Sequence, residues 1–194
     1  MPNLPAPPRI LLTGRPGCGK TTVIRRGVEQ IGRDRCAGFY TEEVRERGRR
    51  VGFDVVTLAG RRGPLARLGA RGPRVGRYGV DLASFDELGV GALERALEAG
   101  APVLVVDELG KMELYSARFV AILEQLFDPA ASHAVLGTVM ERSHPKVDPL
   151  RGRPGVEVIR VTERNRCELP ARLGEIYVNF VAGIGSWDTP ATGA

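Results

Sequence analysis

The chain is poor in cysteine and in long apolar runs, and both shortages exclude classes of protein. Its three cysteines, Cys18, Cys36 and Cys167, are an odd number without the spacing of metal ligands, which excludes a disulfide framework and a structural zinc site. No apolar run is long enough to cross a bilayer, and residues 1–8 lack the apolar region of a signal peptide. We therefore expect a cytoplasmic protein that does not contact a membrane.

Aromatic residues are also scarce, at 6% of the chain, and no basic motif interleaved with aromatic residues is present. Known nucleic-acid modules commonly carry such a motif. The chain is nevertheless basic, with a net charge of +5 and arginine clusters at residues 45–50, 61–62 and 151–153. This charge suits a site for a polyphosphate as well as RNA or DNA. A nucleic-acid partner therefore stays open but is not favoured.

What the chain does contain is a glycine-rich loop directly after the apolar run Ile10-Leu11-Leu12. The loop reads Gly14-Arg15-Pro16-Gly17-Cys18-Gly19-Lys20-Thr21-Thr22 and fits the phosphate-binding pattern G-x-x-x-x-G-K-[ST] in its strand-loop context. Glycines let successive N–H groups turn inward around a β-phosphate. Lys20 brings a charge to the β- and γ-phosphates, and Thr21 offers its hydroxyl to Mg²⁺. The loop predicts that the chain binds a nucleoside triphosphate.

Residues outside this loop alternate between strand and helix patterns. A helix that starts near Lys20 has apolar residues at helical spacing. We expect a β-hairpin from strands over 37–44 and 51–58, then a loop over 60–79 with one short strand at most. Ser84 or Asp86 is expected to cap a helix that Gly100 ends. The remaining patterns predict strands over 103–106, 134–138 and 156–161, and helices over 119–127 and from 169 to about 180.

Alternating strands and helices predict an α/β fold with three layers, in which a mostly parallel central sheet carries an inserted β-hairpin. The chain has 194 residues, 43% of them hydrophobic and 26% charged, which suits a single domain with a full core. We find no internal repeat and no linker that divides it. We expect one domain over residues 9–182, with short flexible tails at 1–8 and 183–194.

An acidic motif follows the apolar run Val103-Leu104-Val105-Val106, which is typical of a central strand covered on both faces. Asp107 and Glu108 come directly after it, in the pattern of a Walker B strand. We expect Asp107 to hold Mg²⁺ through a bound water, and Glu108 to polarise the attacking water beside the γ-phosphate. Glu108 favours hydrolysis, because in a kinase a carboxylate that activates water would waste the triphosphate.

Two other positions are candidates for contact with the γ-phosphate. Thr138 ends the strand pattern of residues 134–138, where open α/β sheets place their ligands. A hydroxyl that only satisfies the strand end is an equally good interpretation. In the loop that follows, Arg142 is a better candidate for a phosphate contact than His144.

The order of these motifs resembles the THEP1-like nucleoside-triphosphatases, a family of small P-loop NTPases, from about Arg9 to Leu173. The most specific part is Val106-Asp107-Glu108-Leu109-Gly110-Lys111-Met112-Glu113-Leu114. Shorter matches are Gly38-Phe39-Tyr40-Thr41-Glu42-Glu43-Val44-Arg45, Gly52-Phe53, Arg77-Tyr78-Gly79-Val80-Asp81, Val161-Thr162 and Asn165-Arg166. The resemblance implies a Mg²⁺-dependent hydrolase that converts nucleoside triphosphates to diphosphates with broad base tolerance. It also implies a P-loop NTPase fold of the RecA or ASCE type.

The resemblance further implies that the nucleotide contacts the phosphate loop and the Walker B segment. Lys111 and Glu113 are then expected beside the γ-phosphate, and Asn165 and Arg166 near the base or ribose. Together with the motifs above, this makes Lys20, Asp107 and Glu108 the expected catalytic residues, and Thr21 and Asp107 the expected metal ligands. The full binding set is Arg15, Pro16, Gly17, Cys18, Gly19, Lys20, Thr21, Thr22, Val103, Leu104, Val105, Val106, Asp107, Glu108, Leu109, Gly110, Asn165 and Arg166.

The predicted function is a stand-alone triphosphatase for ATP, GTP, CTP and UTP, acting as a monomer or weak oligomer. Arg45, Arg77, Arg142 or Arg166 is expected to supply positive charge to the transition state, and the sequence does not select one. A small nucleotide or nucleoside kinase is the first alternative, because such kinases share the phosphate loop, the length and arginine-rich lids. The second alternative is a nucleotide-gated RNA- or DNA-binding protein, in which hydrolysis resets binding.

Overall fold

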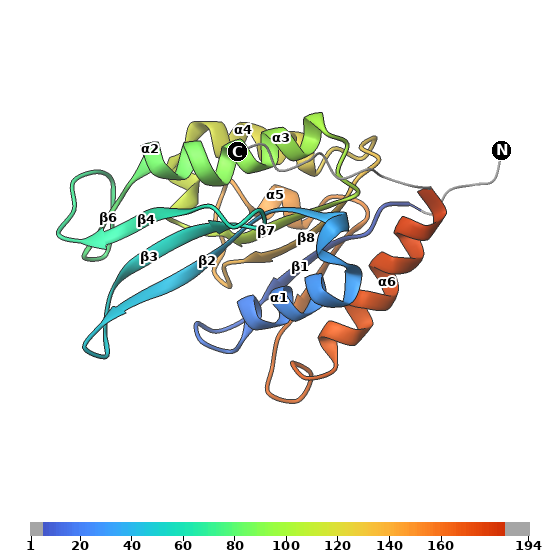
Figure 1. Ribbon diagram of the computed structural model, residues 1–194, viewed down its shortest axis with the longest axis horizontal. Helices are drawn as coiled ribbons and strands as arrows, with labels where there is room; N and C mark the ends of the chain where they lie inside the picture. Colours follow the sequence, from blue (N-terminus) through green and yellow to red (C-terminus); the bar gives the residue numbers. More distant parts are fainter. Residues whose placement is uncertain (1–5, 185–194) are drawn as a thin grey trace.

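A computed structural model describes residues 6–184 of the chain. Within this range one sheet of nine strands has the order β5-β6-β4-β3-β2-β7-β8-β1-β9, and helices cover both of its faces (Figure 1). The strands are β1 (Arg9–Thr13), β2 (Cys36–Glu46), β3 (Arg49–Thr57), β4 (Arg62–Leu68), β5 (Arg74–Val75), β6 (Tyr78–Val80), β7 (Val103–Leu109), β8 (Ala134–Val139) and β9 (Val156–Arg160). The helices are α1 (Lys20–Ile31), α2 (Leu82–Phe85), α3 (Gly91–Glu98), α4 (Ala117–Leu126), α5 (Asp148–Arg151) and α6 (Leu169–Ile184), with short helical segments η1 (Arg33–Arg35), η2 (Asp86–Val90) and η3 (Glu113–Tyr115).

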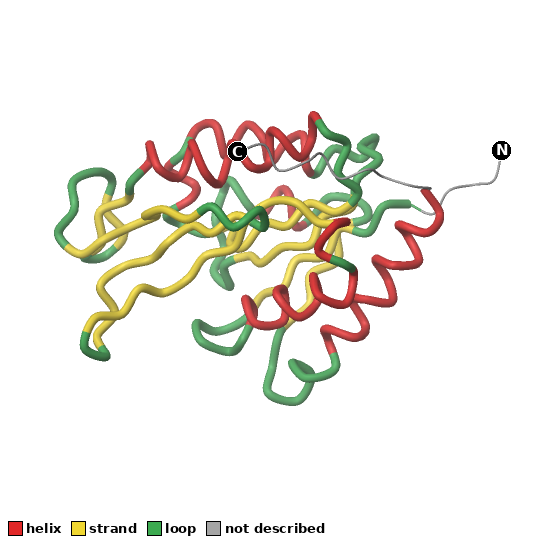
Figure 2. The backbone as a smooth tube through the Cα atoms, in the orientation of Figure 1, coloured by secondary structure: helices red, strands yellow, loops and turns green. Residues whose placement is uncertain are grey.

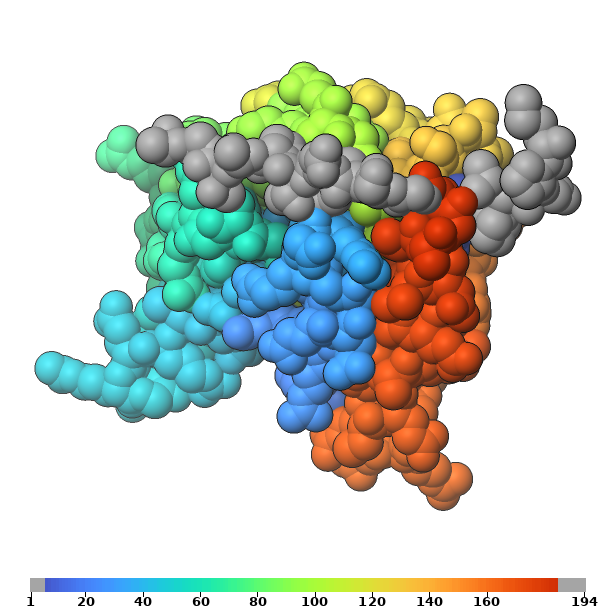
Figure 3. All heavy atoms as spheres, turned by 45° about the vertical axis from the view of Figure 1, so that its right-hand side comes forward, coloured from blue at the N-terminus to red at the C-terminus, as the bar shows by residue number. Residues whose placement is uncertain are grey.

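The helices form two layers, one on each side of the sheet (Figure 2). On one face α1 and α6 lie side by side (Figure 3) and bury apolar side chains such as Ile24 and Tyr177. On the other face α2, α3 and α4 pack over a second core, in which Phe39, Phe85 and Phe119 make edge-to-face contacts. The predicted α/β fold with three layers is confirmed.

Parallel strands form the half of the sheet that carries the nucleotide motifs. β2, β7, β8, β1 and β9 run parallel, and β8 lies between β1 and β7. Leu12 on β1 pairs with Thr138 on β8, and Val106 on β7 pairs with Gly137 on β8. Because parallel strands end at the same edge of a sheet, this register brings the phosphate loop, the Walker B acids and Thr138 to one place.

The antiparallel half is larger than the single inserted hairpin that we predicted. β3, β4, β6 and β5 extend the sheet outward from β2 in antiparallel pairs, so the sheet is mixed. The prediction for residues 60–79 was wrong, because β4, β5 and the start of β6 lie there. The sequence of β4 has no apolar alternation that would indicate a strand. The strand is held instead by ion pairs from Arg62 and Arg67 to Asp54 on β3. We call residues 41–80 the antiparallel wing.

The helix expected before Gly100 is divided into three parts, α2, a π-helical segment η2 and α3. Asp81 caps it, rather than Ser84 or Asp86, and accepts a hydrogen bond from the Ser84 N–H at 3.0 Å. The cap prediction was therefore wrong by one turn. Gly100, with a φ of +67°, follows the last helical turn as predicted.

At the C-terminal end, α6 continues to Ile184, two residues beyond the predicted domain boundary at 182. Gly183 and Ile184 are therefore helical and do not belong to a tail. Residues 1–5 and 185–194, which make up most of the predicted tails, lie outside the described residues. Of the helices in the described range, none has both the length and the apolar character needed to span a membrane.

Candidate active site

The phosphate loop joins the end of β1 to the start of α1. Gly14, Gly17 and Gly19 have φ values of +144°, +78° and +104°, which residues with side chains rarely adopt. A Cβ on Gly14 would lie 2.9 Å from the carbonyl oxygen of Val161, so close packing also requires glycine there. Lys20 Nζ donates a hydrogen bond to the Gly14 carbonyl at 3.1 Å. Gly19 caps α1 without a side-chain hydrogen bond, which leaves the first helical N–H groups open to an anion.

The Walker B acids lie within β7, which continues to Leu109 and does not end at residue 106 as predicted. The pairing of β7 with β8 shifts register between Val106 and Leu109, and the peptide bond between Asp107 and Glu108 is cis. Asp107 is only 1% exposed. Its Oδ1 accepts a hydrogen bond from the Thr138 hydroxyl. Its Oδ2 is buried without a hydrogen-bond partner among residues 6–184.

The apolar residues of β7 do not line the site. Val103, Leu104, Val105 and Val106 are 0% exposed and alternate between the two cores. Leu109 is also buried. A parallel strand covered on both faces presents only its end to a ligand, so these side chains of the predicted binding set are not exposed to a nucleotide. These five side chains support the strand on which the acids lie.

Burial is the main influence on both acids. It raises the pKa of Asp107, while the hydrogen bond from the Thr138 hydroxyl, the nearby Thr21 hydroxyl and the charge of Lys20 lower that pKa in part. Burial likewise raises the pKa of Glu108, which Lys20 lowers and Asp107 raises further. The predicted catalytic residues, from β7 and the start of α1, therefore interact with one another and with Thr138.

The residues present fit a bound Mg²⁺. The unpartnered Oδ2 of Asp107 and the nearby Thr21 hydroxyl are oxygen donors, the ligand type that Mg²⁺ prefers. The described part of the chain has no group of three or more His, Cys, Asp or Glu residues that could hold a metal. Mg²⁺ commonly keeps several waters and binds through one or two carboxylates and the substrate's phosphates. This donor set suits a metal ion that arrives with the nucleotide.

The sequence profile of a family described as NTPase matches residues 9–173. The chain belongs to this NTPase family. The nucleoside-triphosphatase THEP1 of Thermotoga petrophila is 44% identical over 162 residues, which cover 83% of this chain and 88% of that protein. The cancer-related nucleoside-triphosphatase of Homo sapiens is 44% identical over 174 residues, which cover 82% and 91%. The crystal structure of THEP1 from Aquifex aeolicus matches with a TM-score of 0.77 at 36% identity, over 85% of this chain and 96% of that one.

Glu113, which the THEP1 resemblance placed beside the γ-phosphate, is buried in this NTPase at 4% exposure. A Cβ on Gly110 would lie 2.7 Å from Glu113 Oε2 and 3.5 Å from Glu108 Cγ, so Glu113 packs against the turn that follows Glu108. Burial, with the neighbouring Glu108, raises the pKa of Glu113 to about 8. Lys111 in the same turn is exposed.

Asn165 and Arg166 lie in the loop between β9 and α6 of this NTPase. The loop itself uses both ends of the Asn165 side chain, because Oδ1 accepts from the Thr162 N–H at 2.8 Å and Nδ2 donates to the Arg160 carbonyl at 2.9 Å. Arg166 Cδ lies 3.8 Å from the position of a Cβ on Gly19, so this side chain runs along the phosphate loop. Arg166 is exposed beside the phosphate loop, whereas Asn165 holds its own loop together.

Three other arginines were candidates for the transition state. Arg45 forms an ion pair with Glu43 at 2.7 Å, and the Arg77 guanidinium lies 5.9 Å from the ring centre of Tyr78. Arg142 is exposed in the loop after β8. In the same loop the His144 N–H donates to Asp148 Oδ2 at 3.0 Å and thereby stabilises the loop.

Arg50, which no sequence motif singles out, is held by more contacts than these candidates. Its Nε donates to the Tyr78 hydroxyl at 3.1 Å, its Nη1 pairs with Glu43 at 2.7 Å, and its guanidinium lies 5.1 Å from the ring centre of Phe53. In the sequence Arg50 looks the same as its neighbour Arg49. Alternation along β3 alone would place Arg49 on the face of Phe53. The register shift between Val44 and Arg45, which leaves Val51 without a partner on β2, places Arg50 there instead, and the sequence carries no signal for this shift.

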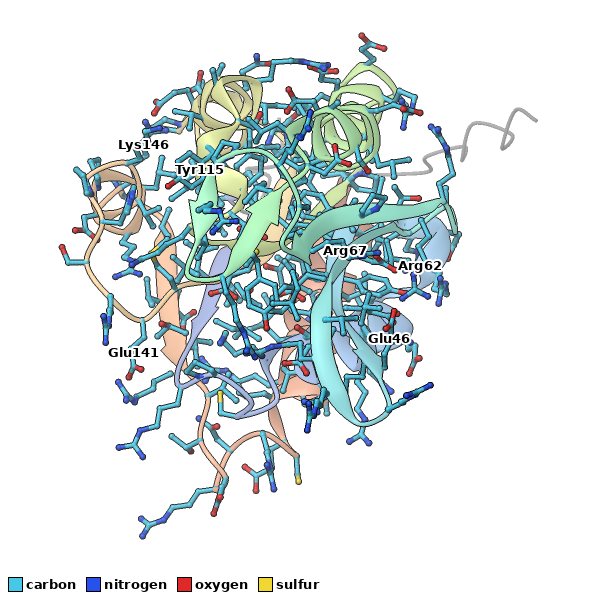
Figure 4. The ribbon with its side chains drawn as sticks, turned by 90° about the vertical axis from the view of Figure 1, so that its left-hand side faces the viewer. Glu46, Arg62, Arg67, Tyr115, Glu141 and Lys146 are labelled. Carbon is cyan, nitrogen blue, oxygen red and sulfur yellow. The ribbon has the colours of Figure 1, made fainter. Side chains whose placement is uncertain are left out.

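Figure 4 looks onto the end of the molecule where these parts meet. Glu141 and Lys146, from the segment after β8, lie on one side of the view, and Glu46, Arg62 and Arg67 of the antiparallel wing lie on the other. Tyr115 lies near the top, where its hydroxyl donates to the Arg74 carbonyl at 3.2 Å. The phosphate loop and the ends of β7 and β8 are therefore flanked by the wing.

Proposed function

We propose that this chain is a Mg²⁺-dependent triphosphatase that hydrolyses ATP, GTP, CTP and UTP to the diphosphate and phosphate. The observation that supports it most directly is the juxtaposition of Lys20 with two acids, the buried Asp107 and the half-buried Glu108. Lys20 neutralises the β- and γ-phosphates, and the N–H groups at the start of α1 bind phosphate oxygens. A nucleotide would thus be held mainly by its phosphates, which all four triphosphates share.

Glu108 is the residue we assign to the attacking water. Because burial raises the pKa of its carboxylate, Glu108 is a better proton acceptor than an exposed glutamate. Thr21 and Asp107 would hold Mg²⁺, which, when bound, neutralises charge on the phosphates. Thr138 orients Asp107 through its hydrogen bond to Oδ1. Arg166 lies along the phosphate loop and would bind the nucleotide.

Broad base tolerance is part of this proposal, because the groups assigned above act on the phosphates. Asn165 is the amide that the resemblance places near the base, and the loop uses one of its two N–H donors and one acceptor position of its oxygen. We assign Asn165 to holding this loop rather than to reading one base. A cytoplasmic location and a monomeric or weakly associated state remain predictions from the sequence.

The kinase alternative requires an acceptor and a site without an activated water. Glu108 argues against it, since a base beside the γ-phosphate promotes loss of the triphosphate to water. A kinase would release little phosphate alone and would transfer phosphate to an added nucleoside monophosphate.

Phosphate release from ATP, GTP, CTP and UTP with Mg²⁺ tests the proposal, with and without nucleoside monophosphates. Wild type is compared with Glu108→Gln and with Glu98→Gln, an exposed glutamate on α3 that serves as the matched control. We expect release from all four triphosphates, lost in Glu108→Gln and kept in Glu98→Gln. Transfer only to a monophosphate would establish a kinase, and full activity of Glu108→Gln would refute the assignment of the base.

A further inference from the structure

The positive charge of the chain is concentrated in the antiparallel wing. Residues 41–80 contain ten arginines and four acidic residues, a net charge of +6, whereas the whole chain carries +5. The remainder of the chain, including the phosphate loop, is therefore close to neutral. Charge of one sign gathered on one part of a fold attracts a ligand of the opposite sign, and the substrate's own phosphates bind elsewhere.

Half of these arginines have no acidic partner. Arg45, Arg50, Arg61, Arg62 and Arg67 form ion pairs with glutamate or aspartate side chains. The other five are exposed and form no ion pair with an acid among residues 6–184: Arg47, Arg49, Arg71, Arg74 and Arg77. All five lie at or next to the turns that join strands of the wing.

The topology places these turns at the same edge of the sheet as the phosphate loop. β2 pairs with β7 up to Phe39 and Val106 and then continues to Glu46. The β2–β3 turn therefore projects about 23 Å beyond that pairing, at about 3.3 Å per residue. β4 runs in the direction of β2, because both are antiparallel to β3, so its end and the β5–β6 turn lie at the same edge. Figure 1 shows both turns at the left-hand end of the molecule.

An exposed aromatic ring lies beside the β5–β6 hairpin, which carries Arg74 and Arg77. Tyr115 is 48% exposed, and its hydroxyl donates to the carbonyl of Arg74 at 3.2 Å. Figure 4 shows Tyr115 beside the β5–β6 hairpin. A fixed ring beside several cations is the combination by which proteins bind single strands, because bases stack on the ring while the cations bind the backbone phosphates.

We propose that the turns of the antiparallel wing, with Tyr115, form a binding surface for single-stranded nucleic acid beside the nucleotide site. Phosphodiester groups suit arginine because the guanidinium donates two parallel hydrogen bonds to one phosphate. A base that stacks on Tyr115 distinguishes this ligand from an acidic peptide or from inorganic polyphosphate, neither of which has a base. Binding at this surface does not require hydrolysis of the NTP. A binding experiment therefore tests this proposal separately from the proposed function.

Binding is tested with a fluorescent oligouridylate of about 15 nucleotides, and with oligo(dT) of equal length, at several salt concentrations. The test variant is Arg49→Gln/Arg71→Gln/Arg74→Gln. The control variant is Arg26→Gln/Arg33→Gln/Arg95→Gln, which removes the same charge from exposed arginines outside the wing. Each phosphate contact contributes about −0.7 to the slope of log affinity against log salt, so we expect the wing variant to lower the slope by about 2 units. We expect its affinity to fall about tenfold or more, and the control to match wild type.

Tyr115→Leu tests the base contact. We expect it to weaken oligonucleotide binding at least about fivefold, the equivalent of about 1 kcal/mol for a stacked base, and to leave polyphosphate binding unchanged. If the wing and control variants weakened oligonucleotide binding equally, the effect would come from net charge alone, and the proposal would be overturned. Equally tight binding of a poly-glutamate peptide, or a wing variant that changes only the KM for the nucleotide, would also overturn it. A difference between oligouridylate and oligo(dT) would identify which nucleic acid the surface prefers.

Discussion

The Thr138 hydroxyl donates a hydrogen bond to Oδ1 of Asp107, so the end of β8 fixes one oxygen of the candidate metal ligand on β7. A hydroxyl has one hydrogen to donate, and Thr138 donates it to Asp107. It therefore cannot donate to a γ-phosphate at the same time. The sequence left two interpretations of Thr138 equal, a contact with the γ-phosphate and a hydroxyl that only satisfies the strand end. In the structure the hydroxyl is satisfied by Asp107, so Thr138 acts on the site by orienting that residue.

We expect Thr138→Val to impair the enzyme through Asp107. Valine has the shape of threonine without the hydroxyl, so Oδ1 of a carboxylate that is 1% exposed loses its partner. The free energy of unfolding should fall by about 1–3 kcal/mol, and the Mg²⁺ concentration needed for half-maximal turnover should rise. Urea unfolding and a Mg²⁺ titration of phosphate release measure the two effects. Thr138→Ser is the control, and a serine variant as defective as the valine variant would show that the methyl group matters more than the bond.

Lys20→Ala should lose nucleotide binding while the protein stays folded. The Lys20 ammonium is the positive charge that interacts with both Asp107 and Glu108, and no other lysine or arginine is among the causes that shift their pKa values. In the alanine variant the phosphates of the bound nucleotide lose their positively charged partner. Such a loss costs about 2–5 kcal/mol of binding free energy, which weakens affinity for the nucleotide by about 30-fold or more. Equilibrium binding of a fluorescent triphosphate measures this loss. Arg26→Ala on the exposed face of the same helix is the control, and undiminished binding by Lys20→Ala would contradict the site.

Glu108→Gln should separate binding from hydrolysis. The amide keeps the size of the side chain but cannot accept a proton, so we expect kcat to fall by about 10²–10⁴. Affinity for the triphosphate should stay within about threefold of wild type, because the interaction is used mainly in the transition state. Single-turnover phosphate release and equilibrium binding measure the two quantities. Equal loss of both would mean that Glu108 serves the metal or the fold.

Glu113→Gln should change how stability depends on pH. The folded-state pKa of Glu113 is raised to about 8 from an ordinary value of 4.5, so the folded protein holds a proton there that the unfolded chain has released. Its contribution to stability is therefore fully present below about pH 4.5 and is lost as the pH rises through 8, at up to about 1.4 kcal/mol per pH unit. Glutamine stays neutral, so the variant should lose less stability than wild type between pH 5 and 8. Urea unfolding across this range measures the slopes, with Glu98→Gln as the control; parallel slopes for all three proteins would refute the raised pKa.

The nucleotide motifs could be predicted from the sequence because each depends on neighbouring residues. The glycines of the phosphate loop, Lys20 and the acids after Val106 all lie within short segments whose spacing is fixed by the phosphates they bind. The antiparallel wing could not be predicted in the same way. β4 is stabilised by ion pairs from Arg62 and Arg67 to Asp54 on β3. The pattern of residues within β4 does not reveal a partner that lies on another strand. The burial of Glu113 likewise depends on how the turn at Gly110 packs, which spacing alone does not reveal.

The last prediction concerns Arg166, whose side chain runs along the phosphate loop with its Cδ 3.8 Å from the Cβ position at Gly19. Because the phosphate loop binds the part of the substrate that all triphosphates share, we assign Arg166 to the phosphates and not to the base. We therefore expect Arg166→Ala to raise the KM for ATP, GTP, CTP and UTP by similar factors, about tenfold for the loss of one charge-assisted hydrogen bond of about 1.5 kcal/mol. Steady-state kinetics with the four substrates measure this, with the exposed Arg164→Ala in the same loop as the control. A large loss for one base alone would make Arg166 a base-reading residue, and a fall of about 10³ in kcat at unchanged KM would make it the transition-state arginine instead.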